Sequence, residues 1–226
     1  MKSIYQTALG PDFEKLHPQI QKRFGFSSQS NTASVGTGTM DRVWHGKWYT
    51  LPFLWLGTWR NIMFPSSGKN IPFTIQNYAY LDSFGRETVT WVRTFFFKKR
   101  PRRFDATMIY SQKTQRVVDY LGTHQHLAVD INVGVDPNGG IRIRSGAQRF
   151  YEGPIAFVFP KLFTGSAEVC EWYDDTEQKF KIDVEVKNEF WGPLFGYSGT
   201  FDAEFKRVSP DAVPTEVKPL REERRE

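Results

Sequence analysis

Four polar residues interrupt otherwise apolar faces of predicted β-strands, and they are the residues of this sequence best suited to chemistry. Burying such a side chain costs about 1–3 kcal/mol unless a partner satisfies it. The four residues are Asn77, Arg93, Arg149 and Glu171. Two aromatic residues, Trp91 and Tyr151, share a predicted face with the two arginines. This set predicts a binding site for a hydrophobic small molecule with a polar or anionic end.

A second interpretation of the same residues leaves no site. Arg93 or Arg149 would pair with Glu171 in a buried ion pair inside a filled core. Alternation places Arg149 on the same strand face as Ile141, but a β-bulge at Gly146 would turn the residues after it to the opposite face. The sequence leaves both interpretations open.

A catalytic version of the first interpretation is an isomerase or cyclase in the same pocket. Glu171 would move a proton, and Arg93 or Arg149 would stabilise an oxyanion. The motifs Gly-x-Ser-x-Gly and Gly-x-Gly-x-x-Gly and the Walker loop do not occur in the sequence. The one cysteine, Cys170, adjoins Glu171, and a neighbouring carboxylate raises the pKa of a thiol. Whether any reaction is catalysed stays open, and no catalytic residue is assigned.

The spacing of His124 and His126 is that of half a metal site on a strand. The same phase continues through Asp130 and Asn132, which indicates a solvent-facing side. No second group of ligands stands at a metal-binding spacing. The sequence therefore predicts surface histidines, no metal and no cofactor.

The elements that must position these residues are β-strands. Residues 179–186 alternate strictly, with Phe180, Ile182 and Val184 apolar and charged residues between them. Similar runs, separated by turn residues, predict strands at 35–44, 71–81, 88–97, 103–110, 116–121, 126–135, 141–151, 166–173, 179–190 and 198–206. The predicted fold is mainly β, either one strongly bent antiparallel meander sheet or an open β-barrel.

Two helical segments accompany the strands. Residues 11–24 carry an apolar helical stripe that Pro18 interrupts, and His17 is placed to cap the second half. Residues 48–64 are apolar on nearly every side and are expected to pack on the sheet as a short helix. A lid over a pocket, a protein interface and a peripheral contact with a membrane surface remain alternatives for this segment.

The charge, cysteine content and hydropathy of the chain indicate which partners and which compartment to expect. The chain has 226 residues, a net charge of +5 and 16% aromatic residues. Five of the positive charges lie in residues 98–103, so the pI of about 9.2 reflects one hairpin tip and predicts no nucleic-acid partner. A single cysteine and the absence of a signal peptide or transmembrane segment predict a cytoplasmic protein. Residues 1–207 are expected to form one β-rich domain, and residues 208–226 form a charged, proline-containing tail.

Several stretches resemble a bacterial family known as domain-of-unknown-function family 4166. They are residues 77–91, 103–108, 120–126, 149–154 and 191–197. The resemblance covers residues 5–205 and carries no established activity or catalytic residue. Some relatives are fused to oxidoreductase-like domains, so the resemblance also implies association with such a domain and a role in small-molecule metabolism.

Three functions are therefore compared: a ligand-binding module, an enzyme in the same cup, and a structural interaction domain with a filled core. A continuous apolar cavity of roughly 300 Å³ or more would favour the first two. A packed interior would favour the third.

Overall fold

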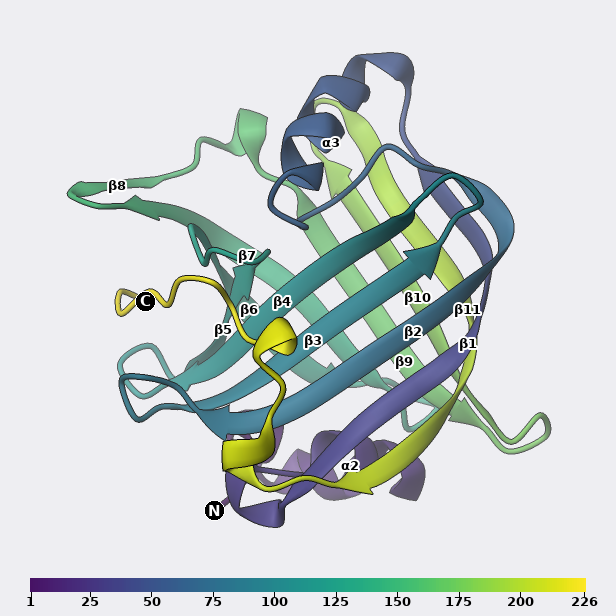
Figure 1. Ribbon diagram of the computed structural model, residues 1–226, viewed down its shortest axis with the longest axis vertical. Coiled ribbons are helices and arrows are strands. Elements are labelled where there is room, and N and C mark those ends of the chain that lie inside the picture. The colour runs from purple at the N-terminus through teal and green to yellow at the C-terminus, as the bar shows by residue number, and fades with distance from the viewer.

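A closed antiparallel β-barrel forms the body of the molecule (Figure 1). The structure, a computed structural model, describes residues 1–226, with every side chain except that of Lys161. The strands follow the order β6-β5-β4-β3-β2-β1-β11-β10-β9-β7-β8, and pairing of β6 with β7 closes the ring and leaves β8 outside it. The predicted fold class is confirmed, and the ring is closed rather than open.

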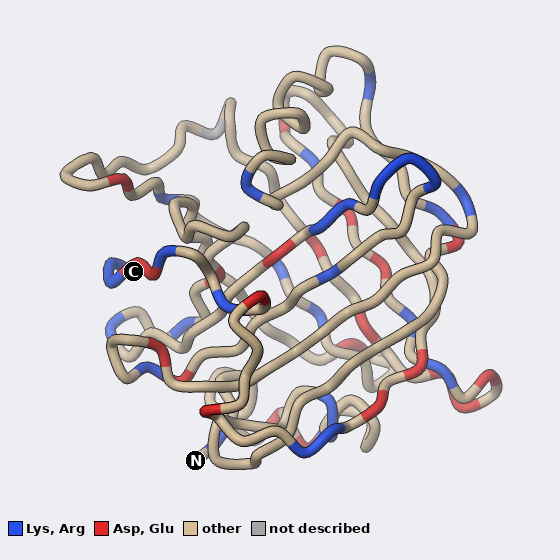
Figure 2. The backbone as a smooth tube through the Cα atoms, viewed as in Figure 1, with Lys and Arg blue, Asp and Glu red and all other residues tan. Residues whose placement is uncertain are grey.

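Most of the predicted strands are present in the structure. They are β1 Thr32–His45, β2 Gly68–Leu81, β3 Glu87–Phe96, β4 Pro101–Ser111, β5 Arg116–Leu121, β6 Leu127–Val135, β7 Ile141–Glu152, β8 Ile155–Val158, β9 Ser166–Asp174, β10 Lys179–Asn188 and β11 Gly192–Arg207. Alternation decides which side chains fill the barrel, because Phe180, Ile182 and Val184 of β10 are buried while Asp183 between them is exposed. Figure 2 shows charged residues spread along strands and turns, with the longest basic stretch at the β3–β4 hairpin.

Two strand predictions differ from the structure. β11 begins at Gly192 rather than at residue 198, because Pro193 pairs with Lys187 at a register shift instead of ending the strand. β8 was not predicted because all four of its residues are exposed, so it has no buried face to impose an alternating pattern.

The helices are short. They are α1 Ile4–Leu9, η1 Gly10–Lys15, α2 Pro18–Phe24, η2 Ser28–Ser30, η3 Trp48–Thr50, α3 Leu51–Thr58, η4 Lys161–Phe163, η5 Pro210–Ala212 and η6 Thr215–Val217. Those of the C-terminal tail, η5 and η6, lie on the outer wall of the barrel. The predicted cap is confirmed, since the backbone N–H of Gln19 donates to His17 Nδ1 over 3.2 Å at the start of α2. None of the helices in the described chain has the length and apolar character needed to span a bilayer.

The N-terminal helices plug one end of the barrel, and α3 lies over the other (Figure 1). Ile4, Phe13, Ile20 and Phe24 are all less than 5% exposed, so the plug is part of the hydrophobic core. The expected helix of residues 48–64 is shorter than predicted. α3 stops at Thr58, and the chain turns at Asn61, which has a φ of 55°.

A bulge in β7 reverses the facing of its second half. Val129 pairs with Gln148 while Ile131 pairs with Ser145, so β7 carries an extra residue near Gly146. Gln148 consequently faces the interior, and Arg149 faces the outer wall. The prediction that Arg149 shares the inner face of Ile141 is wrong for this reason, and the same shift moves Tyr151 outward.

The C-terminal tail runs across the outside of the barrel (Figure 1). Val213 and Val217 are buried with Tyr78 and Tyr80 on the outer face of β2. Further along, the hydroxyl of Tyr151 donates to the backbone carbonyl of residue 226 over 2.9 Å. The tail therefore covers apolar side chains on the outer wall.

Candidate functional site

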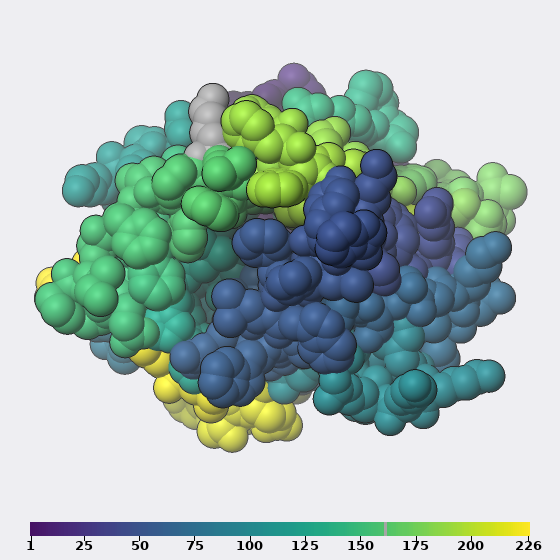
Figure 3. Space-filling model, turned by 90° about the horizontal axis from the view of Figure 1, so that it is seen from above, coloured from purple at the N-terminus to yellow at the C-terminus, as the bar shows by residue number. Residues whose placement is uncertain are grey.

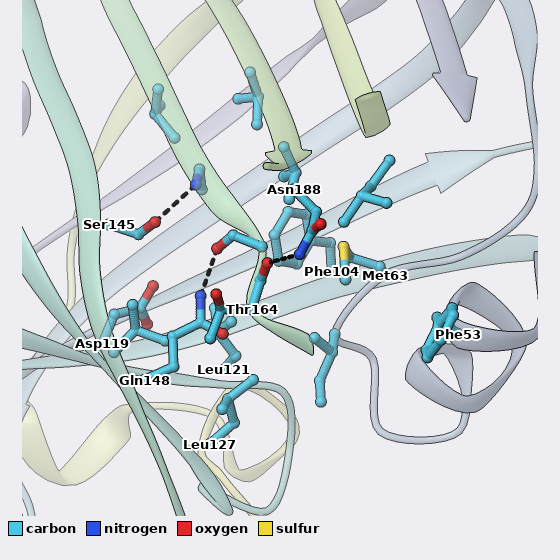
Figure 4. A pocket seen from close by; sticks show the side chains of 18 of the residues that line it. Phe53, Met63, Phe104, Asp119, Leu121, Leu127, Ser145, Gln148, Thr164 and Asn188 are labelled. Atoms are coloured by element: carbon cyan, nitrogen blue, oxygen red, sulfur yellow. Dashed lines mark hydrogen bonds between the residues drawn. The ribbon is translucent and has the colours of Figure 1, made fainter. Parts of the chain in front are cut away.

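An internal cavity of about 160 Å³ lies between the strands and α3. Its opening lies between α3 and the segment that joins β7 to β9, as the view onto that end shows (Figure 3). The walls are largely apolar, and Figure 4 shows Phe53, Met63, Phe104 and Leu127 around the space. The volume is about half of the 300 Å³ expected. It is close to the ~150 Å³ at which a dry apolar cavity accepts one benzene-sized molecule.

Asp119 carries a carboxyl group into this cavity. It lies on the inner face of β5 between Val117 and Leu121, and its register partners are Met108 on β4 and Val129 on β6. Its neighbours on both sides are therefore apolar, and its side chain is 6% exposed. Nothing in the local sequence offers this carboxyl a partner.

The electrostatic state of Asp119 follows from that environment. Its Oδ1 atom has no hydrogen-bond partner among the described residues. Burial raises the pKa of Asp119 from 3.8 to about 7, and the charge of Arg93 opposes the rise without cancelling it. Near neutral pH this carboxyl therefore exchanges between a form that donates and a form that only accepts hydrogen bonds.

Arg93 is the other charged residue among the described side chains that line the cavity. Its Nε donates to the carbonyl of Phe104 over 3.1 Å, and its Nη1 donates to the hydroxyl of Tyr197 over 3.2 Å. Its guanidinium lies 3.7 Å from the centre of the Phe104 ring. These contacts fix the side chain in place while leaving it at the cavity wall, where a ligand can meet its charge.

Trp91 also lines the cavity and joins it to the helical plug. The hydroxyl of Tyr5, from α1, donates to Met108 Sδ over 3.2 Å, and it also contacts Trp91. Burial raises the pKa of Tyr5, with a further rise from the nearby Asp119 charge. The end of the cavity near Asp119 is thus closed by α1, and the opening lies at the α3 end.

Glu171 lies elsewhere in the barrel interior. It is fully buried and forms an ion pair with Arg23 of α2, whose Nη1 donates to Ser34 Oγ over 2.8 Å. Burial raises the pKa of Glu171, while Arg23 and then Arg93 oppose the rise. The ion pair of Glu171 with Arg93 or Arg149 that the sequence left open does not form, and Glu171 pairs with Arg23 instead. Glu171 is absent from the cavity lining, so the geometry gives it no contact with a ligand there.

The remaining predicted residues do not line the cavity. Asn77 faces the barrel interior and donates to the carbonyl of Thr90 over 3.4 Å, while its side-chain oxygen has no partner among the described residues. Arg149 forms an ion pair of 2.6 Å with Asp130 on the outer wall. Tyr151 lies beside it under the tail. Of the six predicted residues, the structure brings Trp91 and Arg93 together at the cavity.

Polar side chains hold the start of β9 and the segment that precedes it over one side of the opening. Ser145 Oγ accepts from the backbone N–H of Ala167 over 2.7 Å, and Gln148 donates to the carbonyl of Gly165. Asn188 Nδ2 donates to the carbonyl of Thr164 over 2.6 Å (Figure 4). These side chains bond to the protein backbone, so we assign them a role in shaping the opening rather than in recognising a ligand.

Sequence reasoning missed Asp119. The signal was present, because a carboxylate alternates with Val117 and Leu121 along one face. The opposite face, with Val118 and Tyr120, is also apolar because the tail covers it. Alternation alone therefore did not identify the inner face of β5.

His124 and His126 stack with ring centres 5.6 Å apart on the outside of the barrel. His126 Nδ1 lies 2.9 Å from a carboxylate oxygen of Glu152 and 3.3 Å from Arg221 Nη1. An arginine in this position disfavours a cation between the rings. Across the described residues, no three or more His, Cys, Asp or Glu side chains gather as a metal site would require.

The fold and cavity together define a helix-plugged β-barrel domain with an internal apolar cavity that holds a buried carboxyl group. The chain belongs to the domain-of-unknown-function family DUF4166, which it matches over residues 16–201. It is 39% identical over 204 residues to the uncharacterized protein YndH of Bacillus subtilis (strain 168), covering 90% of this chain and 98% of that protein. No solved structure matches it.

Proposed function

We propose that the protein is a cytoplasmic binding module for a hydrophobic small molecule, which enters the barrel beside α3 with its polar end toward Asp119 and Arg93. The observation that carries the proposal is the unpaired carboxyl of Asp119 at the inner end of an apolar cavity. Leaving such a group without a partner costs about 1–3 kcal/mol, which a ligand that satisfies it would recover. The single cysteine agrees with a reducing compartment.

The chemistry of the two charged residues defines the ligand class. A hydroxyl end can donate to ionised Asp119 or accept from the protonated acid, whereas a carbonyl end can only accept from the protonated acid. Arg93 offers a positive charge beside either group. A cavity of 160 Å³ holds this end and a short apolar stretch, so a longer chain would extend through the opening past Phe53 and Phe163. An anionic end requires Asp119 to be protonated, because two carboxylates repel each other.

Calorimetric titration with octanol and octanoate tests the proposal, together with native mass spectrometry for a co-purified molecule. We expect one octanol to bind per chain. Octanoate should bind more weakly as the pH rises through about 7, the pKa of Asp119. Ala167→Phe, at the cavity wall, should abolish binding by filling the space. The matched control is Ala212→Phe, the same change at an exposed position of the tail.

Asp119→Asn distinguishes a specific binding site from non-specific hydrophobic binding. This change keeps the shape and removes the charge, so octanoate binding should lose most of its pH dependence. Binding that survives Ala167→Phe would contradict the proposal, as would the absence of binding by the wild-type protein. The isomerase or cyclase alternative assigned proton transfer to Glu171, and the Arg23 ion pair removes the support for that assignment.

A further inference from the structure

Exposed aromatic and aliphatic side chains gather on the segments that border the opening of the cavity. Trp48 is 80% exposed, Trp59 84% and Leu56 68% on the α3 side. Phe163 is 56% exposed and Phe190 65% on the facing segments. We call this set the apolar rim, and Figure 3 views the end of the molecule that carries these segments. Isolated exposed apolar residues need no explanation, but a contiguous set around one opening indicates an interaction surface.

Direct contacts join the chain segments that carry the apolar rim. The Trp191 ring lies 5.9 Å from the Tyr49 ring and 6.5 Å from the Phe53 ring, which joins the β10–β11 turn to α3. The indole N–H of Trp191 donates to the carbonyl of Leu162 over 3.0 Å, which joins the same turn to η4. The rim therefore links three separate chain segments around the cavity opening.

A strongly basic hairpin adjoins the apolar rim. The guanidinium groups of Arg100 and Arg102 lie 5.9 and 5.6 Å from the centre of the Trp55 ring on α3. Lys98, Lys99 and Arg100 are exposed, and none of them forms an ion pair with a described residue. Figure 2 shows this hairpin as the longest basic stretch of the chain. Aromatic residues and unpaired cations thus share one end of the molecule.

We propose that this end of the barrel docks onto an anionic lipid bilayer, with the apolar rim in the headgroup region and the β3–β4 hairpin on the lipid phosphates. Tryptophan favours the membrane–water interface, because its ring is apolar and its N–H needs a polar partner. Each lysine or arginine near an anionic membrane raises the binding constant roughly fivefold. A second copy of the chain fits less well, since two basic hairpins would face each other.

The cavity opening lies inside this docking face. If the proposed ligand function holds, an apolar ligand would move between bilayer and barrel without crossing water. The docking itself needs no ligand, because the residues that carry it, such as Trp48, Trp59 and Lys98, do not line the cavity. The two proposals can therefore fail separately.

Co-sedimentation of the full chain with vesicles tests the docking. One vesicle sample contains phosphatidylcholine alone, and the other contains equal amounts of phosphatidylcholine and phosphatidylglycerol. We expect binding to the anionic vesicles, little binding to the neutral ones, and loss of binding in high salt. In the anionic sample, tryptophan emission should shift to shorter wavelength, and Trp48→Ser with Trp59→Ser should reduce the shift, because these two rings leave water on docking.

Paired variants locate the docking face. Lys98→Glu with Lys99→Glu should lower the partition coefficient roughly tenfold or more, whereas the matched reversal Lys113→Glu with Arg116→Glu, at the β4–β5 turn of the opposite end, should change it little. Trp48→Ser with Trp59→Ser should cause a similar loss. The corresponding control is Leu81→Ser with Phe84→Ser, both exposed at the β2–β3 turn.

Several outcomes would overturn the docking proposal. These are the absence of binding to anionic vesicles, equal losses in rim and control variants, or a solution dimer that Trp48→Ser with Trp59→Ser dissociates. The cavity variant Ala167→Phe should keep full vesicle binding even where octanol binding is lost. Absence of octanol binding by the wild-type protein would therefore count against the ligand-binding proposal and leave the docking intact.

Discussion

Glu171 and Asp119 are buried carboxyl groups of the same barrel, but their surroundings differ. Glu171 meets a guanidinium from α2, so its charge is compensated and its position is structural. Asp119 meets apolar side chains and a cavity, and burial raises its pKa to about 7. The two carboxyl groups differ because α2 supplies Glu171 with a cation, whereas the strand neighbours of Asp119 are apolar. A ligand in the cavity can therefore reach Asp119.

Asp119→Asn should change how stability depends on pH. The pKa of Asp119 is about 7 in the folded state and near 3.8 in the unfolded chain, so the folded state holds this proton more tightly. Its contribution to the free energy of unfolding is therefore full below about pH 4 and is lost as the pH rises through 7. The loss is at most about 4 kcal/mol, and the variant should not show it.

Urea denaturation of the wild type and the variant at a series of pH values measures this effect. Asp211→Asn, which removes an exposed carboxyl from the tail, is the control and should leave the pH profile unchanged. Parallel profiles for wild type and Asp119→Asn would show that Asp119 ionises normally in the folded protein.

Among the strands, two features determine which side chains are buried. They are a single extra residue in β7 and the C-terminal tail packed on the outer wall. The bulge near Gly146 turns Gln148 inward and Arg149 outward. The tail supplies Val213 and Val217 to a cluster on the outer wall of β2. A strand in this barrel can thus be buried on both faces, which removes the simple alternation that identifies an inner face.

Replacing Val213 and Val217 together with alanine should destabilise the barrel. Both side chains are less than 7% exposed against Tyr78 and Tyr80, so their loss should lower the free energy of unfolding by roughly 2–4 kcal/mol. Thermal unfolding measures the change. Leu220→Ala, at a tail position that is 77% exposed, should cost less than about 0.5 kcal/mol. Equal stability in both variants would mean that the tail does not contribute to folding.

The whole molecule is asymmetric along the barrel axis. The N-terminal helices fill one end with core residues, while the other end carries the cavity, the apolar rim and the basic hairpin (Figures 1 and 2). The cavity end is also less extensively paired, since β8 pairs with β7 alone and all its residues are exposed. Local opening should therefore occur at the cavity end.

Amide hydrogen exchange should report this asymmetry. We expect the amides of β8 to exchange several orders of magnitude faster than those of β2, which is paired on both sides by β1 and β3. Mass spectrometry of peptides from the exchanging protein gives both rates in one experiment, and β11, paired by β1 and β10, serves as a second slow reference. Equal protection of β8 and β2 would contradict a cavity end that opens more readily.

Much of the fold was readable from the sequence because alternation records burial. The charged and apolar positions of β10 and the capping histidine His17 obey local rules, and the structure confirms both. Arg93 and Trp91 were also placed correctly on one inner face. Glu171 was recognised as a buried charge, but its partner Arg23 lies 148 residues away and on a helix. No local pattern reports such a pairing.

Local patterns in the chain predict an antiparallel, mainly β molecule with a few charged residues in its interior, because period-two burial is a property of each strand alone. Three features follow instead from contacts across the barrel: the ring closes, Arg23 neutralises Glu171, and Asp119 is left facing a cavity. Those outcomes depend on which segments meet across the barrel, and contacts between distant segments leave no periodic trace in either one.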